Sequence, residues 1–138
     1  MFLDASAIVA ILVEEPGWQE LQTRLSTSRT SRHFSGIVRY EASLAIARQR
    51  AGKRKPTNLQ LAGALAAVDE FLDEADAENV DIGADISSLA IEASMQYGKA
   101  VGHPADLNLG DCFAYACAKA LNVPLLYKGD DFAQTDLA

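Results

Sequence analysis

The sequence predicts an α/β fold: three α/β/α layers with a short parallel sheet of four to five strands. Three observations lead to this expectation. Short apolar segments alternate with longer amphipathic ones along the chain, which is typical of strands alternating with helices. No Asn-Gly turn joins two strand candidates, so a parallel sheet with helices on both faces is favoured over hairpins. With 138 residues, 49% of them hydrophobic and 22% charged, the chain suits a single domain over 1–138.

The first element expected is a buried strand over residues 1–4, which ends on an acid. An apolar helix follows over Ala5–Val13, with Ser6 placed to cap or support its first turn. Pro16 is well placed to start the next helix, because proline fits the first helical position. That second helix is amphipathic and covers Trp18–Leu25.

The middle of the chain predicts a strand, a helical hairpin and another strand. The strand covers Arg32–Ser35, and a long helix with an apolar side follows over Ile37–Arg50. The basic hinge Ala51–Pro56 then leads to a helix over Leu59–Asp73. Asn79–Ile82 is the third strand candidate.

The last third closes the fold with two helices and one strand. An amphipathic helix is expected over Asp85–Tyr97, followed by a loop over Gly98–Asn108. The stretch Leu109–Phe132 combines a buried helix, a turn, a strand over Val123–Tyr127 and an acidic loop. Asp131–Ala138 is a tail too short for a further domain.

Composition limits the environment and the partners. The N-terminal apolar run lacks the basic head and cleavage site of a signal peptide, and acids interrupt it too early for a membrane span. Cys112 and Cys117 follow neither a redox nor a zinc spacing, so we expect free buried thiols and a cytoplasmic protein. The net charge of −7 argues against coating of nucleic acid by the whole surface.

One basic run stands out on this acidic chain. It lies in and beside the hinge and comprises Arg48, Arg50, Lys53, Arg54 and Lys55. The run is interpreted either as a solvated hairpin tip or as a contact for RNA phosphates. No aromatic residue interleaves it, so base stacking is not indicated.

Four acids from distant parts of the chain are expected at one edge of the sheet. Asp4 ends the first strand, Glu41 lies early in the helix after the second, Asp111 begins a helix, and Asp130 follows the last strand. The carboxyl ends of parallel strands share an edge, where such sheets bind ligands. Carboxylates without histidine or cysteine suit Mg²⁺ or Mn²⁺, and such a site fits phosphodiester hydrolysis. Acids at helix starts also occur for the helix dipole alone, so only their joint placement indicates a site.

At these residues the chain resembles the PIN-domain ribonucleases, and among them the VapC-like toxins of bacterial toxin–antitoxin pairs. The resemblance spans nearly the whole chain, through FLDASAIVAIL, VRYEASLAI, HPADLNLGDCFAYACAKALNVPLLYKGDDF and the closing TDL. It implies a PIN-like fold, Mg²⁺-dependent endoribonuclease activity, an antitoxin partner and a homodimer.

The resemblance also implies roles for individual residues. Asp4, Glu41, Asp111 and Asp130 would form an acidic tetrad, with Asp4 and Asp111 as the principal Mg²⁺ ligands and Ser6 orienting ligands or water. In many relatives the last motif is DxDF, whereas in this chain it is GDDF. The sequence therefore leaves open whether Asp130 or its neighbour Asp131 coordinates.

Two other classes of function were weighed against the RNA-cleaving toxin. A phosphatase on a similar sheet would favour an Asp nucleophile in a DxD pattern, whereas Asp4 stands in DAS. A non-catalytic module such as a phosphoacceptor receiver domain would carry an acid pair after the first strand, and no such early pair occurs. Both remain alternatives: a different metal-dependent phosphohydrolase, or an acidic binding module on the same sheet.

Overall fold

The structure is a computed structural model that describes residues 1–137. A four-stranded sheet with the order β3-β2-β1-β4 runs through its middle, and all neighbouring strands are parallel. The strands are β1 (Phe2–Leu3), β2 (Arg32–Ser35), β3 (Ala77–Val80) and β4 (Leu125–Leu126). The α-helices are α1 (Ala5–Leu12), α2 (Trp18–Thr27), α3 (Gly36–Ala51), α4 (Asn58–Glu74), α5 (Ala84–Tyr97) and α6 (Leu109–Leu121). Two 3₁₀ helices complete the chain: η1 (Lys99–Val101) and η2 (Asp131–Gln134).

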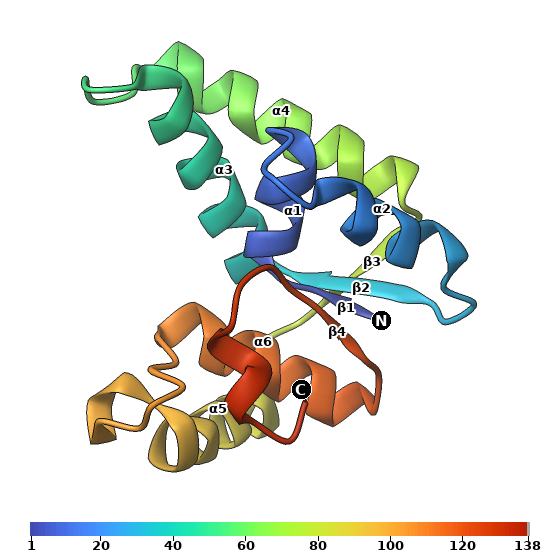
Figure 1. The fold of residues 1–138 in the computed structure, drawn as a ribbon, viewed down its shortest axis with the longest axis vertical. Helices are drawn as coiled ribbons and strands as arrows, with labels where there is room; N and C mark the ends of the chain where they lie inside the picture. The colour runs from blue at the N-terminus through green and yellow to red at the C-terminus, as the bar shows by residue number, and fades with distance from the viewer. Residues whose placement is uncertain (138) are drawn as a thin grey trace.

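The helices form two layers, one on each face of the sheet. Helices α1 to α4 cover one face, and α5 and α6 cover the other (Figure 1). This arrangement confirms the predicted three-layer α/β/α fold and its parallel sheet of four strands. Among residues 1–137 no helix is long and apolar enough to cross a membrane.

Strands β1 and β4 are short and completely apolar. Phe2 pairs with Leu125, and Leu3 with Leu126, while Phe2 also pairs with His33 of β2. Phe2 and Leu3 have no exposed surface, because helices cover both faces of the sheet. This register places the residues that follow β1 and β4 side by side at the carboxyl edge.

The third strand lies two residues earlier than the sequence predicted. It covers Ala77–Val80 rather than Asn79–Ile82, and it pairs with β2 over its whole length. Asp76 turns the chain directly after α4 with a φ of 49°, so pairing starts at once. The prediction missed this because β3 is an edge strand: Glu78 and Asn79 are exposed and show no apolar signal.

The helical hairpin predicted across the basic hinge is present as α3 and α4. The two helices pack along each other and project from the sheet (Figure 1). Arg39 of α3 binds both carboxylate oxygens of Asp69 of α4, at 2.6 and 2.7 Å. Thr57 and Gln60 form a capping box that starts α4.

The remaining differences lie in the C-terminal third. The loop expected over Gly98–Asn108 contains η1 and a single bridge between Gly98 and Leu107. The expected tail forms η2, whose Phe132 is buried in the core. Its final residue, Ala138, lies outside the described residues. Cys112 and Cys117 are free and buried, as expected.

Candidate metal centre

An acidic cavity of about 390 Å³ lies at the carboxyl edge of the sheet. The starts of α1, α3 and α6 meet there with the loop from β4 to η2, which arcs over this edge (Figure 1). The cavity is lined by Asp4, Ala5, Ser6, Val9, Glu15, Glu41, Ala45, Asn108, Asp111, Lys128 and Asp131. Asp4, Glu41 and Asp111 of the predicted acids are therefore brought together, whereas the cavity wall carries Asp131 and not Asp130.

Asp4 links the sheet to the first helix. It follows β1 directly, caps α1, and is only 4% exposed. Its Oδ2 accepts the Ser6 backbone N–H at 2.9 Å and the Ser6 hydroxyl. Burial raises the pKa of Asp4, and the two hydrogen bonds from Ser6 partly oppose that shift. The carboxylate is thus fixed in position by its own helix but is poorly solvated.

Asp111 is held by a capping box at the start of α6. Its Oδ2 accepts the Asn108 N–H at 2.8 Å, and the Asn108 Oδ1 accepts the Asp111 N–H at 3.2 Å. Burial raises the pKa of Asp111 to about 6, and the charges of Asp4 and Asp131 add to this effect. The Asn108 hydrogen bond works in the opposite direction. Asn108 itself lines the cavity and was not foreseen, although N-x-x-D is a helix-start signal.

Glu41 reaches the cavity from α3 and approaches the N-terminal turn of α6. Its carboxylate lies against Gly110, the residue before Asp111. Burial raises the pKa of Glu41 to about 7, with further increases from the charges of Asp4 and Asp111. The three acids therefore interact electrostatically, as expected for carboxylates crowded around one space.

After the last strand, Asp131 and not Asp130 lines the cavity. Asp131 begins η2, lines the cavity, and its charge raises the pKa of both Asp4 and Asp111. Asp130 is exposed and is absent from the cavity wall. The reason is local: the chain turns at Gly129 with a φ of 98°, and η2 then begins with Asp131, which is exposed but lies on the cavity side. Of the two acids that the sequence left open, the structure thus places Asp131 on the cavity wall.

Ser6 connects the cavity to the loop after β4. Its Oγ accepts the Lys128 backbone N–H at 3.0 Å while its hydroxyl donates to Asp4. The Lys128 ammonium donates to the Pro16 carbonyl, so this loop is attached at two points. Lys128 and Glu15 both line the cavity and were missed from the sequence, because loop packing brings them there and no local pattern signals it.

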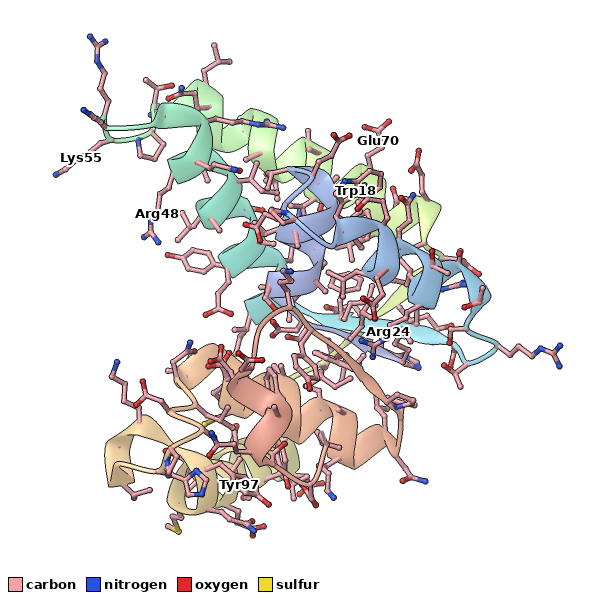
Figure 2. All side chains as sticks on the ribbon, viewed as in Figure 1. Trp18, Arg24, Arg48, Lys55, Glu70 and Tyr97 are labelled. Atoms are coloured by element: carbon pink, nitrogen blue, oxygen red, sulfur yellow. The ribbon has the colours of Figure 1, made fainter. Side chains whose placement is uncertain are left out.

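The basic run lies away from the cavity. Arg48, Arg50, Lys53 and Arg54 are exposed, and none of them lines the cavity wall. They occupy the far end of the α3–α4 hairpin, where Figure 2 shows Arg48 and Lys55 projecting outward. Arg48 is about two helical turns beyond Glu41 on α3.

The donor set suits a hard divalent cation. The wall carries the carboxylates of Asp4, Glu15, Glu41, Asp111 and Asp131, and no histidine or cysteine. Across residues 1–137, no three acidic, histidine or cysteine side chains already stand together as a ready-made metal group. Mg²⁺ sites in proteins commonly use one or two direct carboxylates, with water at the other positions.

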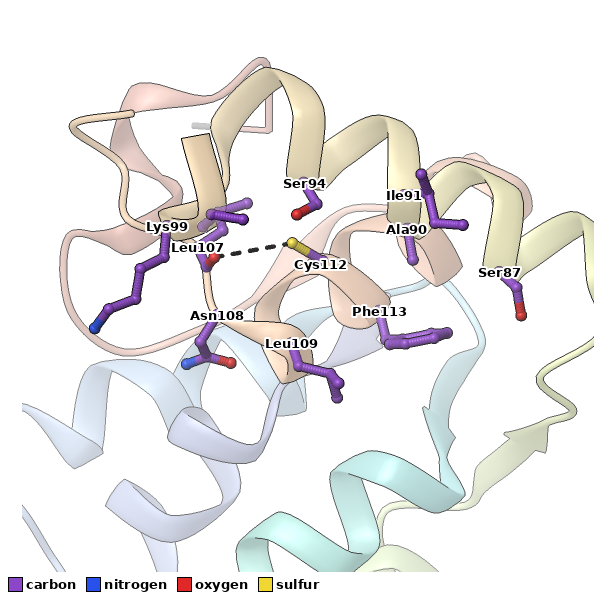
Figure 3. Close-up of a pocket in the computed structure, with 11 residues that line it drawn as sticks. Ser87, Ala90, Ile91, Ser94, Lys99, Leu107, Asn108, Leu109, Cys112 and Phe113 are labelled. Carbon is purple, nitrogen blue, oxygen red and sulfur yellow. Dashed lines mark hydrogen bonds between the residues drawn. The ribbon is translucent and has the colours of Figure 1, made fainter. Parts of the chain in front are cut away.

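A second cavity lies next to the acidic one but differs in chemistry. It measures about 500 Å³ and separates α5 from the start of α6 (Figure 3). Ile91, Leu109 and Phe113 make it apolar, and Asn108 lines both cavities. No carboxylate lines it, so it offers no comparable site for a cation.

The family model for the PIN domain matches residues 1–137. A VapC ribonuclease of Rhizobium meliloti is 49% identical over 139 residues, covering 99% of this chain and 98% of the relative. Ribonuclease VapC42 of Mycobacterium tuberculosis is 39% identical over 137 residues, covering 99% and 96%. The chain therefore belongs to the PIN-domain family, within its VapC ribonuclease group.

A solved structure supports the fold independently. The crystal structure of VapBC2 from Rickettsia felis, bound to a DNA fragment of its promoter, contains a chain that aligns with a TM-score of 0.66. The alignment covers 99% of this chain and 92% of that chain at 17% identity. The arrangement of layers is thus shared even where the sequences have diverged.

Proposed function

We propose that this chain is a Mg²⁺-dependent endoribonuclease and the toxin of a toxin–antitoxin pair. The observation that supports the proposal is that Asp4, Glu41, Asp111 and Asp131, from four separate parts of the chain, line one cavity together with Glu15. The relatives named above are ribonucleases by name, at 39% to 49% identity over nearly full length. RNA is therefore the substrate class, and cleavage of its phosphodiester bonds is the reaction.

We assign separate roles to the residues that line the cavity. Asp4 and Asp111 are the principal ligands, because each is fixed by hydrogen bonds at a helix start. Glu41 and Asp131 complete the site by holding a second ion or positioning the attacking water. When bound, Mg²⁺, or Mn²⁺ in its place, neutralises phosphate charge and lowers the pKa of a coordinated water. Ser6 keeps Asp4 oriented through its hydroxyl and backbone N–H.

The test is RNA cleavage by the purified protein with Mg²⁺, with and without EDTA, beside Asp4→Asn and Asp111→Asn. We expect EDTA to abolish cleavage and each substitution to reduce it by at least about a hundredfold. Cleavage that is insensitive to EDTA, or retained in both variants, would refute the assignment. Hydrolysis of phosphomonoesters without RNA cleavage would favour the phosphatase alternative, and cation binding without either activity would favour a binding module.

The antitoxin partner is proposed to bind the layer formed by α1 to α4. Two hollows on this layer support the proposal: one of about 340 Å³ beside Tyr40 and Leu61, and one of about 490 Å³ beside Leu12 and Phe71. Both hollows combine apolar side chains with polar or charged ones such as Arg39 and Arg32, a mixture that suits an amphipathic segment of a partner protein. The proposed substrate of the toxin is cellular RNA, so the proposed location is the cytoplasm.

The proposed homodimer would use the opposite layer. Ile91, Met95, Val101 and Leu109 expose 57% to 68% of their surface on α5, η1 and the start of α6. Large apolar side chains this exposed, gathered on neighbouring elements, favour association with a second copy. Light scattering should therefore report a dimer, and Met95→Glu with Leu109→Glu should convert it to a monomer. A wild-type protein that stays monomeric at high concentration would remove this part of the proposal.

A further inference from the structure

Gly110 has no conformational reason to be glycine. It is the second residue of α6 and is buried. Its backbone is helical rather than left-handed, unlike that of Gly17, Gly52, Gly102 and Gly129. Glycine is less favourable than alanine inside a helix. The reason for glycine here must therefore lie in what surrounds the position.

The surroundings supply that reason. A Cβ placed on Gly110 would overlap the carboxylate of Glu41, and both Oε atoms are within the overlap. Gly98 is equally crowded, but there the obstacle is the backbone of Ser94, so Gly98 serves the fold. At Gly110 the obstacle is the end of a flexible side chain. An added methyl would displace the Glu41 carboxylate and leave the helix intact.

We propose that Gly110 is a positioning residue for Glu41, because its missing side chain is the space through which the Glu41 carboxylate joins Asp111 at the cavity. Glu41 comes from α3 and must pass over the first turn of α6 to reach the other acids. The side chain at position 110 thus determines whether the Glu41 carboxylate can lie at the cavity. The inference deepens the proposed function and rests on it for its consequence in cation binding.

The geometry is tested without metal by thermal unfolding of four proteins: wild type, Gly110→Ala, Glu41→Ala and the double variant. When residue 41 is alanine, Gly110→Ala should raise the unfolding temperature by roughly 3 °C, since only the helix preference changes. When Glu41 is present, this gain should be absent because the methyl displaces the carboxylate. An identical shift in the two backgrounds would overturn the proposal.

The consequence is tested by titration calorimetry with Mn²⁺. We expect Gly110→Ala to weaken Mn²⁺ binding by about tenfold. Glu41→Asp, which is one methylene shorter, should restore part of that affinity in the Gly110→Ala background. Gly110→Ala should add no loss when residue 41 is alanine. The matched control is Gly36→Ala in the first turn of α3, where a Cβ meets no atom within 4 Å and affinity should be unchanged.

The outcomes separate the two proposals. An equal loss of affinity with and without Glu41 would overturn the positioning role of Gly110 while leaving the metal site in place. A wild-type protein that binds no Mn²⁺ would overturn the proposed function. In that case the metal-free unfolding comparison still decides whether Gly110 makes room for Glu41.

Discussion

Asp4 shows at the scale of one residue how the fold creates an unfavourable electrostatic environment. It caps α1, which requires a position at the helix start, and it follows a central strand, which removes it from water. Asp111 and Glu41 are brought into the same space by α6 and α3. The pKa of all three carboxyls is raised as a result. A bound cation would relieve this cost by compensating their charge.

The assignment of Asp131 is tested by comparing it with its neighbour. Asp131→Asn should reduce Mg²⁺-dependent RNA cleavage by at least about tenfold, because it removes a carboxylate from the cavity wall. Asp130→Asn is the matched control: it makes the same chemical change one residue away, on a side chain that does not line the cavity. Its cleavage rate should stay within about twofold of wild type. If Asp130→Asn reduced cleavage and Asp131→Asn did not, Asp130 would be the acid of the site.

The raised pKa values predict how pH affects the metal-free protein. Folded Glu41 and Asp111 titrate near 7 and 6, whereas their ordinary values are 4.5 and 3.8. Between about pH 5 and 7 the folded state therefore holds protons that the unfolded chain has released, so the free energy of unfolding falls as pH rises. The window ends near pH 7, because the lowered pKa of the N-terminal amine acts in the opposite direction around its ordinary value of 8.0.

Urea unfolding in EDTA at pH 5, 6 and 7 measures this slope. Stability should be highest at pH 5 and lowest at pH 7, and Glu41→Gln should flatten the curve because that group no longer titrates. Saturating Mg²⁺ should stabilise the protein most at pH 7, where the carboxyls are ionised. Stability that is constant or rises from pH 5 to pH 7 would show that the acids are not crowded as the structure places them.

At the scale of single elements, helix starts position the site. Asp4 caps α1, and Asp111 belongs to the capping box of α6. Only Glu41 lies beyond a first turn, and it reaches the cavity across Gly110. The carboxylates of Asp4 and Asp111 are thus fixed by the same hydrogen bonds that begin their helices. The helix start and the position of the carboxylate therefore depend on each other.

The Asn108 cap offers a direct test of that dependence. Asn108→Ala should destabilise the protein by about 1 kcal/mol, because the Asp111 N–H loses its acceptor. It should also weaken Mn²⁺ binding by loosening Asp111. Asn108→Ser keeps a capping oxygen and should restore most of both properties. If Asn108→Ala and Asn108→Ser bind Mn²⁺ equally well, the cap does not position Asp111. Urea unfolding and calorimetry provide the two readouts.

The tip of the α3–α4 hairpin is the element proposed to contact RNA phosphates. Replacing Lys53 and Arg54 by glutamine should weaken RNA binding in EDTA and lower the dependence of affinity on salt, since fewer counterions are released. The matched control replaces Arg24 and Arg29, which are exposed cations outside the hairpin. Fluorescence anisotropy at several salt concentrations measures both slopes. If the salt dependence of RNA affinity were equal for wild type and all variants, the hairpin tip would be a solvated turn that does not contact RNA.

At the scale of the whole molecule, much of the fold could be predicted from the sequence. Helices and strands with strong periodicity or continuous apolar runs were located to within a few residues, and β2 matched at both ends. The edge strand β3 was misplaced because half of it is exposed and polar. The parallel topology was sufficient to predict that Asp4, Glu41 and Asp111 converge.

The cavity residues that the sequence could not indicate depend on loop conformation and on packing between distant segments. The choice between Asp130 and Asp131 turns on the Gly129 conformation and on one turn of 3₁₀ helix, which a strand-end rule does not resolve. Lys128 and Glu15 reach the cavity only because two loops pack together. Neither residue stands in a pattern that would indicate this from sequence.

The most direct test of the central claim is anomalous diffraction from crystals soaked with Mn²⁺. The proposed site predicts an anomalous peak within the cavity, coordinated directly or through water by Asp4 and Asp111, and lost in Asp111→Asn. A peak bound elsewhere, or an empty cavity at a Mn²⁺ concentration that supports RNA cleavage, would contradict the claim that these carboxylates form a metal centre.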